Sequence, residues 1–131
     1  MALNLRHMDA SKLSVVCSHP TTPASGDPVL IGSFITGVAT TDERADGTTS
    51  VDLGFSSWDL SVEAVDGSGN SAVAVGDAIF YNSADTPVLN KKSAGVFFGF
   101  ALETITAGET DTIVVAHYPS PGSGSLGAGQ V

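Results

Sequence analysis

Residues 26–40 read GDPVLIGSFITGVAT, and residues 76–102 read GDAIFYNSADTPVLNKKSAGVFFGFAL. Each stretch begins with Gly-Asp and continues into a short apolar run. Each then reaches a glycine, one large apolar residue and an alanine, at residues 37–39 and 99–101. A phrase used twice in a small chain serves either chemistry or architecture, and these residue types favour architecture.

Gly-Asp predicts a turn, because glycine tolerates a positive φ and aspartate hydrogen-bonds nearby backbone. The apolar run predicts the strand that follows. The later glycine lets another backbone come close, and the small alanine suits a crowded inner face. We therefore expect structural turn glycines at Gly26, Gly37, Gly76 and Gly99. Gly108-Glu109, before the apolar run at 112–116, is a third and weaker copy.

The remainder of the chain also alternates short apolar runs with turn signals. We count about nine strand-length runs and no amphipathic helix of ten residues, a pattern typical of all-β barrels and sandwiches. In residues 58–65, period-two alternation places Trp58, Leu60, Val62 and Ala64 on one face. We predict a small single-domain barrel or sandwich at 13–118, with an extended N-terminal arm at 1–12 and a Gly/Ser-rich tail at 119–131.

Composition restricts the partners of this chain of 131 residues. Fourteen acidic and five basic residues give a net charge of −9, and charged residues make up only 15%. Since nucleic-acid binding depends on Lys and Arg, we expect no nucleic-acid partner, and we expect no adhesion to an anionic membrane. The one basic cluster, Lys91-Lys92, is predicted to be a solvated loop. Low charge suits a chain packed against other subunits.

Other signals lead us to expect synthesis in a reducing cytoplasm. Cys17 is the sole cysteine, so no disulfide forms within one chain. The first residues lack the apolar segment of a signal peptide, and no apolar run approaches the roughly 20 residues of a membrane-spanning helix.

Catalytic motifs are scarce. The three histidines are far apart in the sequence, and Cys17 with His19 supplies two ligands where zinc needs at least three. The GSGN stretch at 67–70 lacks the Lys of a phosphate-binding loop. We expect no catalytic residue, no metal and no cofactor. A small β-barrel enzyme with a pair of carboxylates stays open as an alternative.

The residues SGDPVLIG (25–32), GVA (37–39), VGDAIFYN (75–82) and GFAL (99–102) give the chain a resemblance to small tailed-phage capsid decoration (cement) proteins. Some members carry a label as RecA/RadA-like phage recombinases, which the missing phosphate loop does not support. The resemblance covers roughly residues 23–116, and the chain departs from it at GFSSW (54–58) and in its tail. The matching residues are Ser25, Gly26, Asp27, Val29, Gly32, Gly37, Val38, Ala39, Gly76, Asp77, Tyr81, Gly99 and Ala101.

The resemblance implies a structural virion protein on the outer capsid surface that bridges major capsid protein subunits and stabilises the shell. It also implies a homo-oligomer, with a trimer favoured over a dimer. We expect the N-terminal arm to contact the capsid or a sister subunit through Leu3, Leu5, Arg6, Met8 and Lys12. A tail or fibre module of the virion is the second alternative.

Overall fold

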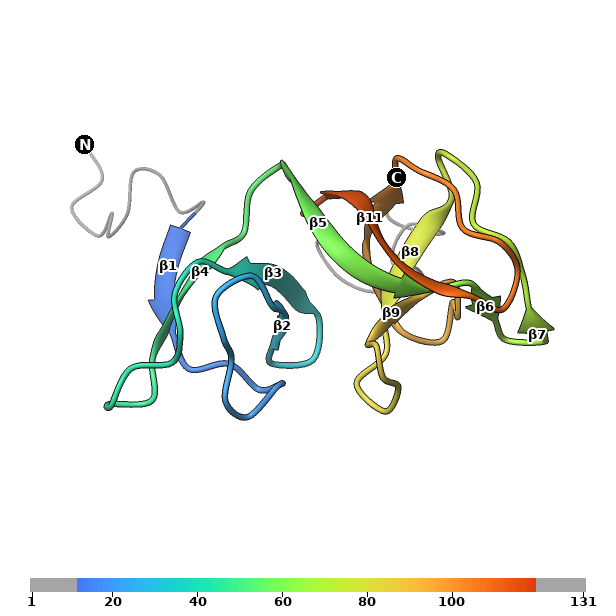
Figure 1. Cartoon of the computed structure of the whole chain (residues 1–131). Helices are drawn as coiled ribbons and strands as arrows, with labels where there is room; N and C mark the ends of the chain where they lie inside the picture. Colours follow the sequence, from blue (N-terminus) through green and yellow to red (C-terminus); the bar gives the residue numbers. More distant parts are fainter. Residues whose placement is uncertain (1–11, 120–131) are drawn as a thin grey trace, which may run out of the picture.

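The first half of the chain forms a four-stranded antiparallel sheet in the computed structural model, which describes residues 12–119 (Figure 1). The strand order is β1-β4-β3-β2. Its strands are β1 (Lys12–Val15), β2 (Pro28–Ile31), β3 (Ile35–Ala39) and β4 (Thr49–Asp52). The β2–β3 hairpin lies within the first Gly-Asp stretch, residues 26–40, and Gly32 in its turn has a φ of 65°. Val29, Ala39 and Val51 form the small core of this sheet.

The second half closes into a barrel with the order β10-β11-β5-β9-β8 (Figure 1). All neighbouring strands in it are antiparallel except β5 and β9, which meet in parallel at Val62 and Leu89. A hairpin of two short strands extends from the barrel. The barrel strands are β5 (Ser56–Glu63), β8 (Ala78–Tyr81), β9 (Leu89–Asn90), β10 (Val96–Ala101) and β11 (Thr110–His117), and the hairpin strands are β6 (Val65–Asp66) and β7 (Gly69–Asn70).

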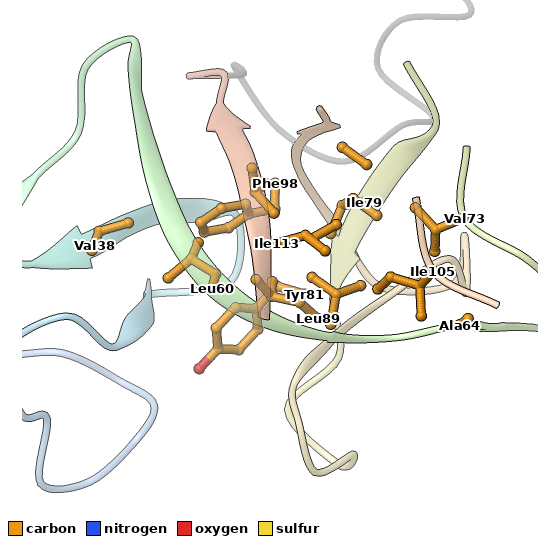
Figure 2. Packing of buried hydrophobic residues seen from close by; sticks show 13 residues of the cluster. Val38, Leu60, Ala64, Val73, Ile79, Tyr81, Leu89, Phe98, Ile105 and Ile113 are labelled. Carbon is orange, nitrogen blue, oxygen red and sulfur yellow. The ribbon is translucent and has the colours of Figure 1, made fainter. Parts of the chain in front are cut away.

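The barrel encloses the main hydrophobic core (Figure 2). The predicted alternation along β5 is confirmed, because Leu60, Val62 and Ala64 are buried while Asp59 and Ser61 are exposed. The other buried members of this core are Val38, Val73, Ile79, Tyr81, Leu89, Phe98, Ala101, Ile105, Ile113 and Val115. Val38 comes from the four-stranded sheet, so the main core extends across the junction between sheet and barrel.

These observations confirm the all-β barrel prediction. The described residues contain no helix, and therefore none that is long and apolar enough to cross a membrane. Two details differ from expectation. The described region has eleven short strands rather than about nine, and Lys12, which we assigned to the arm, is the first residue of β1.

The repeated Gly-Asp phrase is one backbone module. In the first copy, the Asp27 N–H donates to the Ala24 carbonyl, which closes a turn with Gly26 at its third position and a φ of 93°. A type II turn needs this positive φ. The Gly26 N–H donates to the carbonyl of Ala39, and the Ala39 N–H donates back to the Asp27 carbonyl. The turn is therefore tied to the end of β3, the strand that pairs with β2.

The second copy repeats these contacts. The Gly76 N–H donates to the Ala101 carbonyl at 2.8 Å, and the Ala101 N–H donates to the Asp77 carbonyl at 2.9 Å. Gly76 has the same φ of 93° as Gly26. The aspartate side chain also has the same role, since the carboxylate of Asp77 accepts from the Ala74 N–H as that of Asp27 accepts from Ala24. This contact lowers the pKa of Asp77 below its ordinary value.

The weaker copy at Gly108-Glu109 makes the same pair of bonds. The Gly108 N–H donates to the Ala64 carbonyl, and the Ala64 N–H donates to the Glu109 carbonyl, both at 2.8 Å. In all the copies the residue held by these two bonds is a fully buried alanine. Ala39 and Ala101 are the last residues of β3 and β10, and Ala64 directly follows β5. The phrase is architecture, as predicted.

The later glycines of the phrase lie inside strands and not in turns. Gly37 is in β3, and a Cβ there would lie 2.5 Å from the Val51 side chain and 2.9 Å from the Asp52 carbonyl. Gly99 is in β10, where a Cβ would lie 1.9 Å from the carbonyl oxygen of Ala116. Naming these two turn glycines was wrong, and their role is the close approach of a neighbouring strand.

Candidate functional site

The junction between sheet and barrel is held by a buried histidine. His117, at the end of β11, is 1% exposed. Its Nδ1 lies 2.8 Å from the Gly54 carbonyl oxygen, and its Nε2 lies 3.1 Å from the Thr36 hydroxyl of β3. Since a carbonyl only accepts, Nδ1 carries the proton and Nε2 accepts from Thr36. Burial lowers the pKa of His117, so the neutral ring ties the two parts of the molecule together.

A second contact across the junction joins His19 and Tyr81. The Nδ1 of His19 lies 2.6 Å from the Tyr81 hydroxyl, and the two rings meet edge to face at 5.7 Å. Burial raises the pKa of Tyr81, so the hydroxyl keeps its proton. Sequence reasoning missed both histidine contacts, because their partners lie 62 and 81 residues away.

A groove of about 320 Å³ lies beside this contact. Its lining residues include Asp27 and Asp85, two acidic residues of the kind that the enzyme alternative requires. Both carboxylates already have partners. That of Asp27 accepts from the Ala24 N–H, and that of Asp85 pairs with Lys92 and accepts from Asn90. Hydrogen bonds from Lys92 and Asn90 lower the pKa of Asp85, which suits a structural anion and not a general acid.

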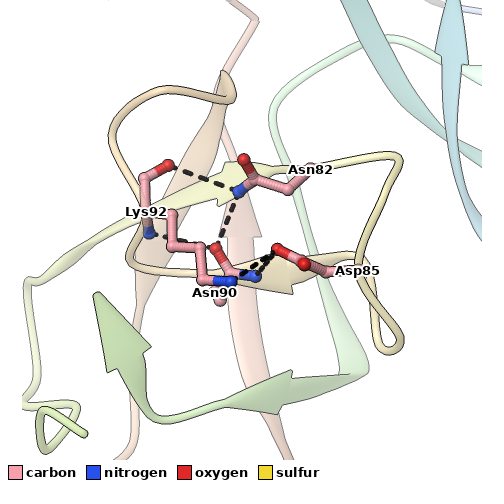
Figure 3. A network of polar contacts seen from close by, with 4 residues as sticks. All are labelled: Asn82, Asp85, Asn90 and Lys92. Carbon is pink, nitrogen blue, oxygen red and sulfur yellow. Dashed lines mark hydrogen bonds and ion pairs between the residues drawn. The ribbon is translucent and has the colours of Figure 1, made fainter. Parts of the chain in front are cut away.

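The Asp85 carboxylate belongs to a polar network that fixes the segment between β8 and β10 (Figure 3). Asn90 is fully buried at its centre. The Asn90 side-chain oxygen accepts from the Asn82 amide at 2.7 Å and from the Lys92 N–H at 3.0 Å, while its amide donates to Asp85 at 2.9 Å. The network satisfies the buried amide of Asn90 and links residues 82, 85 and 92 through it.

The basic pair is not a solvated loop, and that prediction was wrong. The Lys91 ammonium lies 3.1 Å from the Asp77 carboxylate and also donates to the Ala72 carbonyl. The Lys92 ammonium lies 3.1 Å from Asp85. Both lysines therefore form ion pairs within the chain. The sequence alone showed only two adjacent positive charges.

Within residues 12–119, no group of three or more His, Cys, Asp or Glu side chains is placed to hold a metal ion. Cys17 packs against the small core of the four-stranded sheet, while the His19 side chain bonds Tyr81. Burial raises the pKa of the Cys17 thiol, which makes it a weak nucleophile. The polar contacts of His117, His19, Asp85 and the two lysines described above hold segments of the fold together.

The predicted partner residues Leu3, Leu5, Arg6 and Met8 lie outside the described residues. Lys12 is exposed at the start of β1, the strand at one edge of the four-stranded sheet. Arg44 lies beside the same strand and donates to the Ser14 hydroxyl at 3.1 Å. Among the described residues neither cation forms an ion pair with a carboxylate. The β1 edge, where the preceding residues join the sheet, therefore carries the unpaired positive charge of the described region.

A family model described as phage cement protein matches residues 8–117. The matched stretch contains every strand of both the sheet and the barrel. No curated protein and no solved structure gives a significant match.

Proposed function

The chain belongs to the phage cement protein family, and on that premise we propose that it binds the outside of an assembled phage capsid and stabilises the shell by bridging major capsid protein subunits. The family match over residues 8–117 is the observation that carries this proposal. A protein of this kind acts by filling and joining surfaces, so its function rests on shape and contact and not on a reaction.

The architecture suits a mechanical role. Sheet and barrel share core residues and two side-chain hydrogen bonds, one that the Thr36 hydroxyl donates to His117 and one between His19 and Tyr81. A bridging protein has to transmit force between its contact points, and a rigid body does so better than a hinged one. The groove at the junction holds carboxylates that already have partners, which gives no support to the enzyme alternative.

We assign capsid contact to the β1 edge and the segment that precedes it. An edge strand presents unpaired backbone N–H and C=O groups, to which an extended segment of a partner adds as a further strand. Lys12 and Arg44 place positive charge at this edge of a chain whose net charge is −9. The residues predicted for partner contact are Leu3, Leu5, Arg6, Met8 and Lys12, and they lie in or next to this edge in the sequence.

The proposed site of action is the outer capsid surface, after synthesis in the host cytoplasm. The net charge of −9 disfavours a position against packaged DNA. Self-association forms part of the proposal, with a trimer favoured over a dimer because three-fold and quasi-three-fold positions recur in capsid shells. Multiple copies on a lattice gain affinity from several contacts made at once.

A capsid co-sedimentation assay with matched truncations tests the contact. Deleting residues 2–11 should abolish or strongly weaken binding to purified capsids, while deleting residues 120–131 should leave binding unchanged. Circular dichroism and melting of each truncated protein separate a binding defect from a folding defect. A folded 2–11 truncation that decorates capsids at full occupancy would contradict the proposed contact, and a full-length chain that never binds capsids would contradict the function.

A further inference from the structure

Five aromatic side chains form a continuous row on the barrel, which we call the aromatic ladder. Successive ring centroids lie 6.0 Å apart for Phe80 and Phe97, 5.3 Å for Phe97 and Phe100, 5.6 Å for Phe100 and Tyr118, and 4.7 Å for Tyr118 and Phe55. The planes of three pairs meet edge to face at 65° to 75°, a geometry that aromatic rings prefer, and those of Phe100 and Tyr118 are tilted at 59°. The ladder joins β8, β10, the residue after β11 and the segment before β5.

The ladder lies on the outside of the barrel. Its strand neighbours Ile79, Tyr81 and Phe98 point into the core, so the alternating Phe80 and Phe97 point outward. At one end of the ladder Phe55 is 70% exposed and Tyr118 is 47% exposed, while the remaining rings are half-buried. A row of five contiguous rings on a surface is unlike isolated exposed apolar residues, and such patches mark interaction sites.

The charge distribution identifies the kind of partner. The sequence segments that supply the ladder contain no Asp, Glu, Lys or Arg, although the chain carries 19 such residues. These segments are 53–58, 78–84, 93–102 and 112–119. Each copy has a net charge of −9, so copies repel one another through most of their surface. The ladder segments carry no charge of their own, so two identical acidic chains meet there with little repulsion.

The segments of the chain outside the structure are poor candidates to cover their own ladder. The described chain ends at residue 119, next to Tyr118, and residues 120–131 contain only Leu126 and Val131 as large apolar residues. Residues 1–11 are richer in apolar side chains, but they join the chain at β1, on the far side of the four-stranded sheet from the barrel (Figure 1). A separate molecule fits the ladder better than either terminus.

We propose that the aromatic ladder is the face through which copies of this chain associate with one another. Phe55 and Tyr118 are the anchors, because they expose the most ring surface and so lose the most contact with water when a second copy covers them. The proposal deepens the self-association put forward above and rests on it. It is independent of capsid binding, because the β1 edge and the ladder are different surfaces.

The test is the mass of the full-length protein in solution, measured by sedimentation velocity and light scattering over a wide concentration range. The wild type should be oligomeric. The double variant Phe55→Ser with Tyr118→Ser should weaken self-association by roughly a hundredfold or more. The matched control is Phe34→Ser, which removes a ring of 53% exposure from the β2–β3 hairpin and should leave the oligomer unchanged. Melting curves show that each variant is folded.

Several outcomes would overturn the proposal. If the wild-type protein stays monomeric at every concentration, the ladder is not an interface between copies. If the Phe55→Ser, Tyr118→Ser variant associates as strongly as the wild type, the contact between copies lies outside the ladder. The same conclusion follows if the Phe34→Ser variant dissociates while the ladder variant does not. A monomeric wild type that begins to associate when residues 120–131 are deleted identifies the chain's own C-terminal segment as the occupant. Capsid binding is measured separately. It tests the proposed function, and its outcome does not change the conclusion about self-association.

Discussion

Substituting Gly99 by alanine tests whether the repeated phrase sets the distance between strands. The added Cβ would lie 1.9 Å from the Ala116 carbonyl oxygen and 2.9 Å from its carbonyl carbon, whereas real Cβ atoms essentially never come within 3.0 Å of another heavy atom. Both atoms belong to the backbone of β11, so no side-chain rotation relieves the clash. Strands β10 and β11 must move apart by about 1 Å in a closely packed barrel.

The cost follows from two contributions. Overpacking of this kind costs about 1–3 kcal/mol. Separation of the strands also weakens one or two ladder hydrogen bonds, such as the one from the Tyr118 N–H to the Phe98 carbonyl, at about 0.5–1.5 kcal/mol each. We expect a loss of about 3–5 kcal/mol in unfolding free energy, which for a domain of this size lowers the melting temperature by roughly 10–20 °C.

The assay is thermal and urea unfolding followed by circular dichroism, with Gly67→Ala as the matched control. Gly67 has no heavy atom within 4 Å of a built Cβ and no positive φ, so the same substitution there should change stability by less than about 0.5 kcal/mol. If Gly99→Ala melted within about 2 °C of the wild type, the close-approach reasoning would be refuted.

Other substitutions separate the remaining features of the fold. Gly26→Ala and Gly76→Ala meet no neighbouring atom but force a side chain into a φ of 93°, so each should cost about 1–2 kcal/mol in chemical unfolding, and no loss at either site would contradict the turn module. Asn90→Ala leaves the Asp85 carboxylate and two N–H donors short of a partner and should cost about 2–3 kcal/mol, with a neutral result arguing against the network. Burial lowers the pKa of His117, so the unfolded chain binds this proton more readily than the folded chain does. The stability that the neutral ring provides is therefore complete above pH about 6.5 and falls as pH drops through the lowered folded pKa. A His117→Gln variant should lose this part of the acid sensitivity, and an unchanged pH profile of melting temperature would contradict it.

Local pattern was enough to predict the all-β class, the inner face of β5 and the Gly-Asp turns. The alternation of residues 58–64 gave the inner face of β5, and the Gly-Asp phrase gave its turns, because a positive φ and a period of two residues are properties of short segments. Even the weaker copy at Gly108-Glu109 was predicted. What its sequence does not show is that its alanine partner, Ala64, precedes the turn by more than forty residues, whereas Ala39 follows its own turn.

Contacts between residues far apart in the chain could not be predicted from the sequence. The barrel closes through one parallel pair, Val62 with Leu89, which no periodicity signals. The ammonium groups of Lys91 and Lys92 find carboxylates only because β8 and β9 bring them together. The aromatic ladder likewise assembles rings from four separate segments, so it does not exist as a motif in the sequence.

Calorimetry of bare and decorated capsids tests the central claim most directly. A protein that binds only the assembled shell stabilises that shell by mass action, by about 2.7 kcal/mol per site when its free concentration is a hundred times its Kd. The account predicts that capsids saturated with the full-length chain melt at a higher temperature than bare capsids, and that the shift shrinks as the chain is diluted. Saturated and bare capsids with the same transition temperature would contradict a cementing role.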